Sequence, residues 1–168
     1  MANYTVLTPA IIEILQLQTK LELGNSQRYH AFAKFCDAKQ YLGAKKFYEK
    51  HSLEEREHMQ KVMSYLIDKR APVMVGETQE YKCDYRDLVE VLELSLGAEK
   101  STTDAWKAIY TLAWKEKDFT TSELALGFLK EQHEEEALFI NILDRWNILK
   151  DMPCGMYFLD CEIEKNYM

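Results

Sequence analysis

Proline and glycine are scarce in this chain of 168 residues, which contains three prolines and six glycines. So few helix-breaking residues exclude a collagen-like repeat and a proline-rich linker. Long apolar runs are also missing, since no segment approaches the roughly 18 apolar residues that a membrane-spanning helix needs. The opening residues, MANYTVLTP, lack the basic and apolar regions of a secretory signal peptide. We therefore expect a cytoplasmic protein with no membrane partner.

The cysteines lack the pairing that metal sites and redox motifs require. None belongs to a CxxC pair, and none has the spacing of zinc ligands: Cys36, Cys83, Cys154 and Cys161. We expect mostly free thiols in a reducing compartment.

Positive charge is in deficit, with 21 Lys and Arg against 28 Asp and Glu and a net charge of −7. An acidic surface repels phosphate backbones, so a nucleic-acid partner is not expected. Hydrophobic residues make up 47% of the chain, which excludes a disordered tail. The length suits one domain spanning residues 1–168.

Between its few prolines the chain is rich in Glu, Leu, Lys and Ala, which favour helices, and it lacks the alternation of strands. Thr8 and Pro9 form a helix start. Asp84 is a candidate cap for a later helix, and Thr120 with Glu123 has capping-box spacing. The pattern predicts four long helices and a short fifth, over residues 9–37, 41–70, 84–115, 120–149 and 156–166.

The connections between these helices indicate the topology. Segments 38–40 and 116–119 are short and join antiparallel neighbours. Segment 71–83 has about 13 residues and could span about 43–47 Å when extended, whereas a helix of 28 residues is about 42 Å long. It could therefore cross the length of an all-α four-helix bundle and make the second and third helices parallel. An ordinary up-down bundle with a loose loop is the alternative.

Polar residues interrupt the apolar stripe of every long helix near its midpoint. In helices of similar length these midpoints meet at one level: Glu22, Glu55 with His58, Glu99, and Gln132 with Glu135. Buried carboxylates are costly unless they are paired or bind metal, and no Lys or Arg lies in the middle of these stripes. Oxygen ligands with one imidazole suit iron or manganese better than zinc.

Each of these residues has a simpler interpretation. Glu is common on helix surfaces, and one Glu-x-x-His match such as Glu55 and His58 often arises by chance. Tyr29 could donate to a ligand or to an iron-oxygen intermediate, or could be a packed core residue. The other histidines lack such partners and are expected at the surface or in packing: His30, His51 and His133.

Taken together, the segments KLEL, SLEEREHMQ, GAEKS, KEQHEEEALF and GMYFLDCEIEK resemble those of the bacterial non-haem ferritins over essentially the whole chain. The resemblance implies a ferritin-like fold in which Glu22, Glu55 and His58 hold one iron. It also implies that Glu55 bridges to a second iron at Glu99, with Gln132 beside it. An adjacent third iron site would be formed by Glu54, Glu131, Glu134 and Glu135.

By the same resemblance, the protein would oxidise Fe(II) with dioxygen or peroxide and store ferric mineral inside a shell of 24 copies. No haem is expected, and the second Glu-x-x-His of bacterioferritins is absent, because Gln132 is followed three residues later by Glu135. Two other functions stay open: a structural shell subunit that binds metal weakly, and a diiron redox enzyme that forms no cage.

Apolar residues outside the core stripes predict self-association. A lone bundle would expose several of them, which a soluble monomer avoids. They are Leu17, Leu21, Leu23, Tyr81, Tyr157 and Tyr167. We expect a large closed homo-oligomer.

Overall fold

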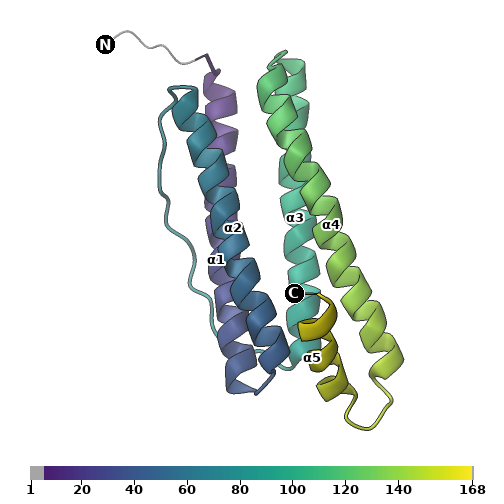
Figure 1. Cartoon of the computed structure of the whole chain (residues 1–168). Coiled ribbons are helices and arrows are strands. Elements are labelled where there is room, and N and C mark those ends of the chain that lie inside the picture. Colours follow the sequence, from purple (N-terminus) through teal and green to yellow (C-terminus); the bar gives the residue numbers. More distant parts are fainter. Residues whose placement is uncertain (1–5, 168) are drawn as a thin grey trace.

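The computed structural model describes residues 6–167 and shows an all-α protein (Figure 1). Four long helices form a bundle, and a short fifth helix packs at one end. The helices are α1 (Pro9–Ala38), α2 (Leu42–Asp68), α3 (Leu88–Lys115), α4 (Phe119–Leu149) and α5 (Gly155–Asn166). The predicted four-helix bundle with a short fifth helix is confirmed.

Two predicted helix caps were wrong because a neighbouring aspartate is the better cap. Asp87, and not Asp84, caps α3, and its Oδ1 accepts the backbone N–H of Glu90 at 2.9 Å. At α4 the cap is Asp118, whose Oδ1 accepts the N–H of Thr121 at 3.1 Å. A carboxylate at the first turn also interacts favourably with the helix dipole. The predicted Thr8 cap of α1 is confirmed, with Pro9 at the first helical position.

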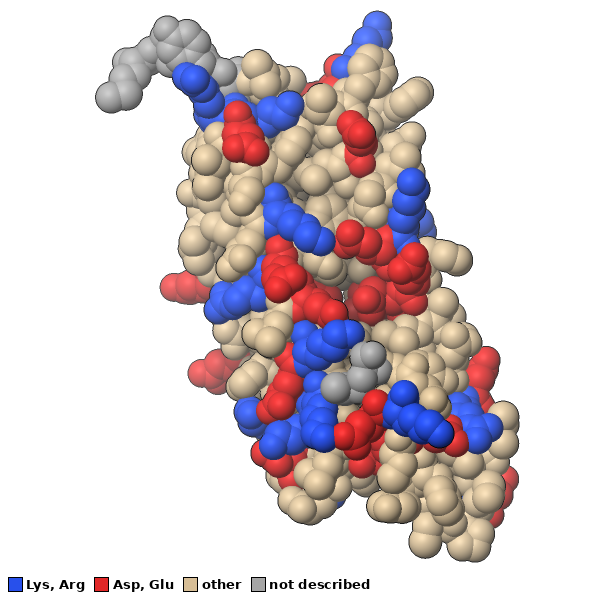
Figure 2. All heavy atoms as spheres, in the orientation of Figure 1, with Lys and Arg blue, Asp and Glu red and all other residues tan. Residues whose placement is uncertain are grey.

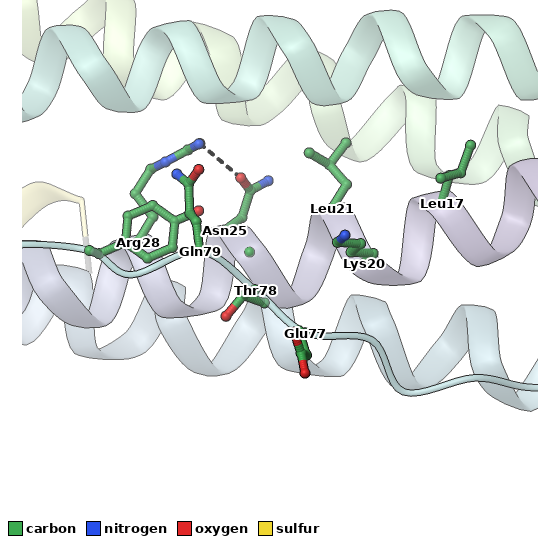
Figure 3. A pocket seen from close by; sticks show the side chains of 10 residues that line it. Leu17, Lys20, Leu21, Asn25, Arg28, Glu77, Thr78 and Gln79 are labelled. Atoms are coloured by element: carbon green, nitrogen blue, oxygen red, sulfur yellow. Dashed lines mark hydrogen bonds between the residues drawn. The ribbon is translucent and has the colours of Figure 1, made fainter.

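The long connection between α2 and α3, residues 69–87, runs back along the bundle beside α1 and makes α2 and α3 parallel (Figure 1). Near its start, Pro72 accepts a hydrogen bond from Gln16 of α1 at 2.9 Å. Further along, Tyr81 lies under the guanidinium of Arg28 at 5.6 Å. Figure 3 shows this segment passing beside α1. Residues of both line a hollow of about 550 Å³. The predicted crossover is therefore present, fixed along α1 by polar contacts.

The apolar core is divided into two clusters by a polar layer. One cluster lies where α1 ends, α2 begins and α5 docks, and it includes Phe32, Phe35, Phe47 and Leu159. The other lies at the opposite end and includes Leu15, Val62, Leu66 and Trp106. All the stripe residues expected to face the core are buried or half-buried. Burying apolar side chains at both ends fixes the height at which the polar residues between them meet.

The four sides of the bundle are not equally closed. Ser26 of α1 and Ser52 of α2 each donate to the other's backbone carbonyl, at 2.7 and 2.8 Å, so these helices lie close together. Between α1 and α3, which we call the closed side, buried Asn25 donates to Thr102 at 2.9 Å. On the open side, between α2 and α4, no two Cα atoms approach within 8 Å. Side chains alone span that gap.

Helix α5 docks on the first turn of α2. The carboxylate of Asp160 accepts the backbone N–H groups of Gly43 at 3.1 Å and of Ala44 at 2.8 Å. A Cβ atom at Gly43 would lie 2.1 Å from the carbonyl oxygen of Asp160. Glycine at this position therefore lets the two helices approach closely enough for the carboxylate to satisfy free donors of α2.

The surface agrees in part with the sequence-based expectation of self-association. Leu17 is 61% exposed and Tyr157 is 66% exposed. Leu23, however, is buried in the bundle, so placing it outside the core was wrong.

All four cysteines are free thiols, as expected. In residues 6–167, no helix has a segment long and apolar enough to traverse a bilayer.

Candidate metal centre

The polar layer brings together one or two residues from each long helix. Glu22 and Glu99 are fully buried, and Glu55 and Gln132 are buried almost as completely. His58 is half-buried, next to the open side. Periodicity explains the convergence, because each residue lies on its helix's core stripe between the two apolar clusters.

Three of these residues form a compact group. Ligand atoms of Glu22, Glu55 and His58 lie within 4.8 Å of one another, close enough to share one metal ion. Glu55 and His58 are one helical turn apart and therefore face the same way. The predicted Glu-x-x-His unit is thus joined by the carboxylate expected from α1.

Neighbouring side chains hold Glu22 and Glu99 in place. Oε1 of Glu22 accepts hydrogen bonds from Gln18 at 2.7 Å and from the indole of Trp106 at 3.2 Å. Glu99 accepts one hydrogen bond from the hydroxyl of Tyr29 and another from Nε2 of Gln132 at 3.0 Å. Tyr29 is therefore both a packed core residue and a donor to Glu99.

Several oxygens in this layer have no hydrogen-bond donor among residues 6–167. They are Oε2 of Glu22, Oε2 of Glu55 and Oε1 of Gln132. Buried polar atoms normally have partners, so three free oxygens at one level indicate a place for a cation. A set rich in oxygen with one imidazole fits iron or manganese, as the sequence predicted.

The electrostatics of this layer point the same way. Burial raises the pKa of Glu55 well above its usual value, and the negative charges of Glu22 and Glu99 raise it further. Burial raises the pKa of Glu99 to about 8, although the hydrogen bond from Tyr29 opposes the shift. Burial, followed by the charges of Glu99 and Glu55, raises the pKa of Tyr29 well above normal, so its hydroxyl stays a donor. Without a cation this layer must hold protons that a bound metal would replace.

A second acidic cluster lies outside the first, on the open side. Figure 2 shows Asp and Glu side chains gathered midway along the molecule there, with Lys and Arg around them. They surround a hollow of about 260 Å³ that is lined by Glu54, Glu57, His58, Lys61, Glu131, Glu134 and Glu135. The four carboxylates that the resemblance assigns to a third site therefore lie around one hollow.

Most of these outer carboxylates already have partners. Glu54 lies 3.4 Å from the amine of Lys50. Glu131 lies 3.3 Å from Nε2 of His58. Burial alone would raise the pKa of Glu135, but its contact with His51 lowers it below the usual value.

His51 is the residue that sequence reasoning misjudged. The expectation that it lacks partners was wrong, since its ring nitrogens lie 3.5 Å from Glu54 and 3.3 Å from Glu135. Its ring also packs against Phe47, with centroids 4.1 Å apart, so the expected packing role is confirmed. The spacing His-x-x-Glu at His51 and Glu54 was the available signal. His30 and His133 are exposed, as expected.

The larger hollow beside the crossover does not suit a cation. Its lining includes the basic residues Lys20 and Arg28 and one acidic residue, Glu77. Figure 3 shows Arg28 hydrogen-bonded to Asn25 there. The side chains that suit a metal ion therefore lie in the polar layer and on the open side.

Comparisons with known proteins agree with this geometry. The ferritin-like domain family matches residues 12–149. A probable bacterial non-heme ferritin-like protein of Haemophilus influenzae is 29% identical over 158 residues, which cover 94% of this chain and 96% of the relative. The bacterial non-heme ferritin of Staphylococcus aureus is 32% identical, with 94% and 95% covered.

Among solved structures, the open-pore ferritin of the archaeon Archaeoglobus fulgidus superposes with a TM-score of 0.90. It is 22% identical, with 94% of this chain and 98% of that chain covered, so the likeness concerns the fold. The family model and the bacterial relatives, in contrast, match this chain in amino-acid sequence. The chain belongs to the ferritin-like domain family, among the bacterial non-haem ferritins.

Proposed function

We propose that this protein is an iron-storage ferritin that oxidises Fe(II) at the polar layer of its own bundle. The observation that carries the proposal is the compact group of Glu22, Glu55 and His58. Both of its carboxylates keep a buried oxygen to which no group within residues 6–167 donates. A structural shell subunit has no need of buried carboxylates that lack counter-charges, because they are destabilising without metal.

In this proposal iron is the substrate, and the chain supplies its ligands. Glu22, Glu55 and His58 bind one Fe(II). Glu55 reaches a second Fe(II), which Glu99 and Gln132 also bind. Two Fe(II) supply two electrons, which with two protons reduce dioxygen to hydrogen peroxide, or peroxide to two waters.

Other side chains keep these ligands oriented. Tyr29 directs its hydroxyl at Glu99, and Gln18 with Trp106 fixes one oxygen of Glu22. The remaining oxygen of Glu22 is then free for metal. Ligands held in advance need less reorganisation when iron enters.

Aerobic oxidation of Fe(II) by the purified protein tests the proposal directly. We expect a fast phase at up to two Fe(II) per chain, followed by slower mineral growth. Wild-type protein that oxidises iron no faster than buffer would leave the weakly binding shell subunit as the better description.

The outer cluster of Glu54, Glu131, Glu134 and Glu135 is proposed to hold a third, more exchangeable iron. Open carboxylate clusters bind hard cations weakly because packing fixes few of the ligands. The double substitution Glu54→Gln with Glu134→Gln should preserve the first turnover but change the iron-to-oxygen ratio and later turnovers. Oxygen-electrode titration measures both. The same charge change at Glu49 and Glu123 is the control, and identical behaviour of the two double variants would reduce the cluster to an acidic surface.

We further propose that the chain assembles into a closed homo-oligomeric shell, which by resemblance has 24 copies. Exposed apolar residues such as Leu17 and Tyr157 support association. Light scattering at micromolar concentration measures the mass. A monomer or dimer that still oxidises iron would instead favour the diiron enzyme without a cage.

A further inference from the structure

His58 differs from the buried carboxylates in having a partner on its outer side. One of its ring nitrogens belongs to the compact group with Glu22 and Glu55. Its Nε2 lies 3.3 Å from Oε2 of Glu131 on α4. A neutral imidazole has one nitrogen that carries hydrogen and one that carries a lone pair, and only the lone pair can bind metal.

Glu131 is itself held in place. Its other oxygen, Oε1, lies 3.6 Å from the amine of Lys61, so the two oxygens face two different partners. Lys61 lies over the ring of Phe128 at 5.7 Å, and that ring meets the ring of His58 at 5.5 Å and 88°. Phe128 therefore limits the rotation of the imidazole while Glu131 faces its Nε2.

We propose that Glu131 is a positioning residue, which accepts the Nε2 hydrogen of His58 and so presents Nδ1 to the metal. The inference rests on the proposed function only in requiring that His58 bind iron. A carboxylate on the far nitrogen of a metal-binding histidine fixes its tautomer and ring orientation. The side chain of Glu131 is 48% exposed, so the contact adds little stability and acts mainly on orientation.

This role links the two metal regions. The resemblance places Glu131 among the carboxylates of the third site, yet the structure directs its Oε2 at His58. If a third cation takes that oxygen, His58 loses its partner. Filling the outer cluster then weakens the hold of His58 on the inner metal, and inner metal weakens the outer site equally.

Co²⁺ binding to the intact protein tests the proposal without iron oxidation. The variants are Glu131→Leu, which removes the acceptor, and Glu131→Gln, which keeps an acceptor oxygen without the charge. Glu123→Leu is the matched control, because Glu123 is also an exposed carboxylate of α4, and it lines a hollow of about 480 Å³ together with Glu131. Titration of the visible Co²⁺ absorption gives affinity, and crystals soaked in Zn²⁺ show which nitrogen of His58 binds.

We expect Glu131→Leu to weaken the first Co²⁺ by about 10- to 100-fold relative to Glu123→Leu. Glu131→Gln should bind the first Co²⁺ nearly as tightly as the wild-type protein does. Zn²⁺-soaked crystals of the wild-type protein should show Nδ1 of His58 on the metal. Equal affinities for the two leucine variants, or Nε2 on the metal, would overturn the role of Glu131. If wild-type protein still oxidises iron in that case, the proposed function stands. Wild-type protein that neither binds Co²⁺ through His58 nor oxidises iron would overturn both.

Discussion

The closed and open sides of the bundle are built from the same kinds of helix but are joined differently. On the closed side, buried Asn25 of α1 and Thr102 of α3 meet across a short gap. On the open side, side chains such as the half-buried His58 and the exposed Glu131 extend between helices whose Cα atoms stay more than 8 Å apart. The bundle therefore has one side fixed by backbone proximity and another that depends on polar side chains.

This difference bears on where we propose that a cation enters and is held. The outer acidic cluster and its hollow lie on the open side, directly outside the half-buried His58. Close helix packing on the opposite side keeps Glu22 and Glu99 fully buried. We propose that one closely packed side and one more adjustable side let the site bind ions and still exchange them.

Removal of Glu55 should have the largest effect, because it takes a proposed ligand from both irons. We expect Glu55→Ala to slow the initial oxidation of Fe(II) at least about 100-fold, since losing even an outer partner of a metal ligand costs about 10- to 100-fold. Stopped-flow absorbance of the ferric product measures it. Glu49→Ala, on the same helix but ion-paired with Lys34 at the surface, is the control. A normal rate in a fully folded Glu55→Ala variant would contradict the assignment.

The second-largest effect is expected in how the unfolding free energy of the metal-free protein depends on pH. The pKa of Glu99 is raised to about 8 in the folded state. As pH rises, the unfolded chain therefore loses this proton at a lower pH than the folded protein does. Its contribution to stability is complete below the ordinary glutamate pKa and is lost as pH rises through about 8. We expect chelator-treated protein to lose a few kcal/mol of unfolding free energy across that window, because each pH unit between the two pKa values removes about 1.4 kcal/mol.

Glu99→Gln should flatten this dependence and stabilise the metal-free protein at alkaline pH. Glu93→Gln, an exposed carboxylate of α3, should leave the slope unchanged. Denaturation at a series of pH values compares the two, and parallel curves for Glu99→Gln and wild type would show that Glu99 ionises normally.

On the closed side, Thr102→Val should cost about 1–3 kcal/mol of unfolding free energy, because it leaves the buried amide of Asn25 without an acceptor. Thr111→Val is the control, since that exposed hydroxyl donates only to the carbonyl of Lys107 on its own helix. Equal losses for the two variants would mean that the closed side does not depend on this hydrogen bond.

The smallest effect is expected on the open side. The hydroxyl of Tyr65 lies 2.7 Å from Thr121 and is half-buried, so water can replace the contact. Tyr65→Phe should cost less than about 1 kcal/mol. The same denaturation measurement checks it. A loss as large as that of Thr102→Val would show that the two sides are equally rigid.

Much of the fold was predictable because it depends on periodicity. The carboxylates predicted at the midpoints of the first three stripes, Glu22, Glu55 and Glu99, are all buried. The caps at Asp87 and Asp118 were missed because neighbouring polar residues offer similar local signals, and geometry decides among them. The partnership of His51 with Glu135 was missed because it joins two helices far apart in sequence. The open side left no trace in the pattern, since α2 and α4 carry stripes like those of closely packed helices.

The division of the chain into two hairpins has a consequence for the order of folding. Short turns join α1 to α2 and α3 to α4, whereas the segment 69–87 separates the pairs. Glu22, Glu55 and His58 all belong to the first hairpin, while Glu99 and Gln132 belong to the second. Local hairpins form before distant elements dock, because long loops are costly to close. We therefore expect the first hairpin alone to offer three ligands to a cation during synthesis, before the second hairpin has emerged to cover it.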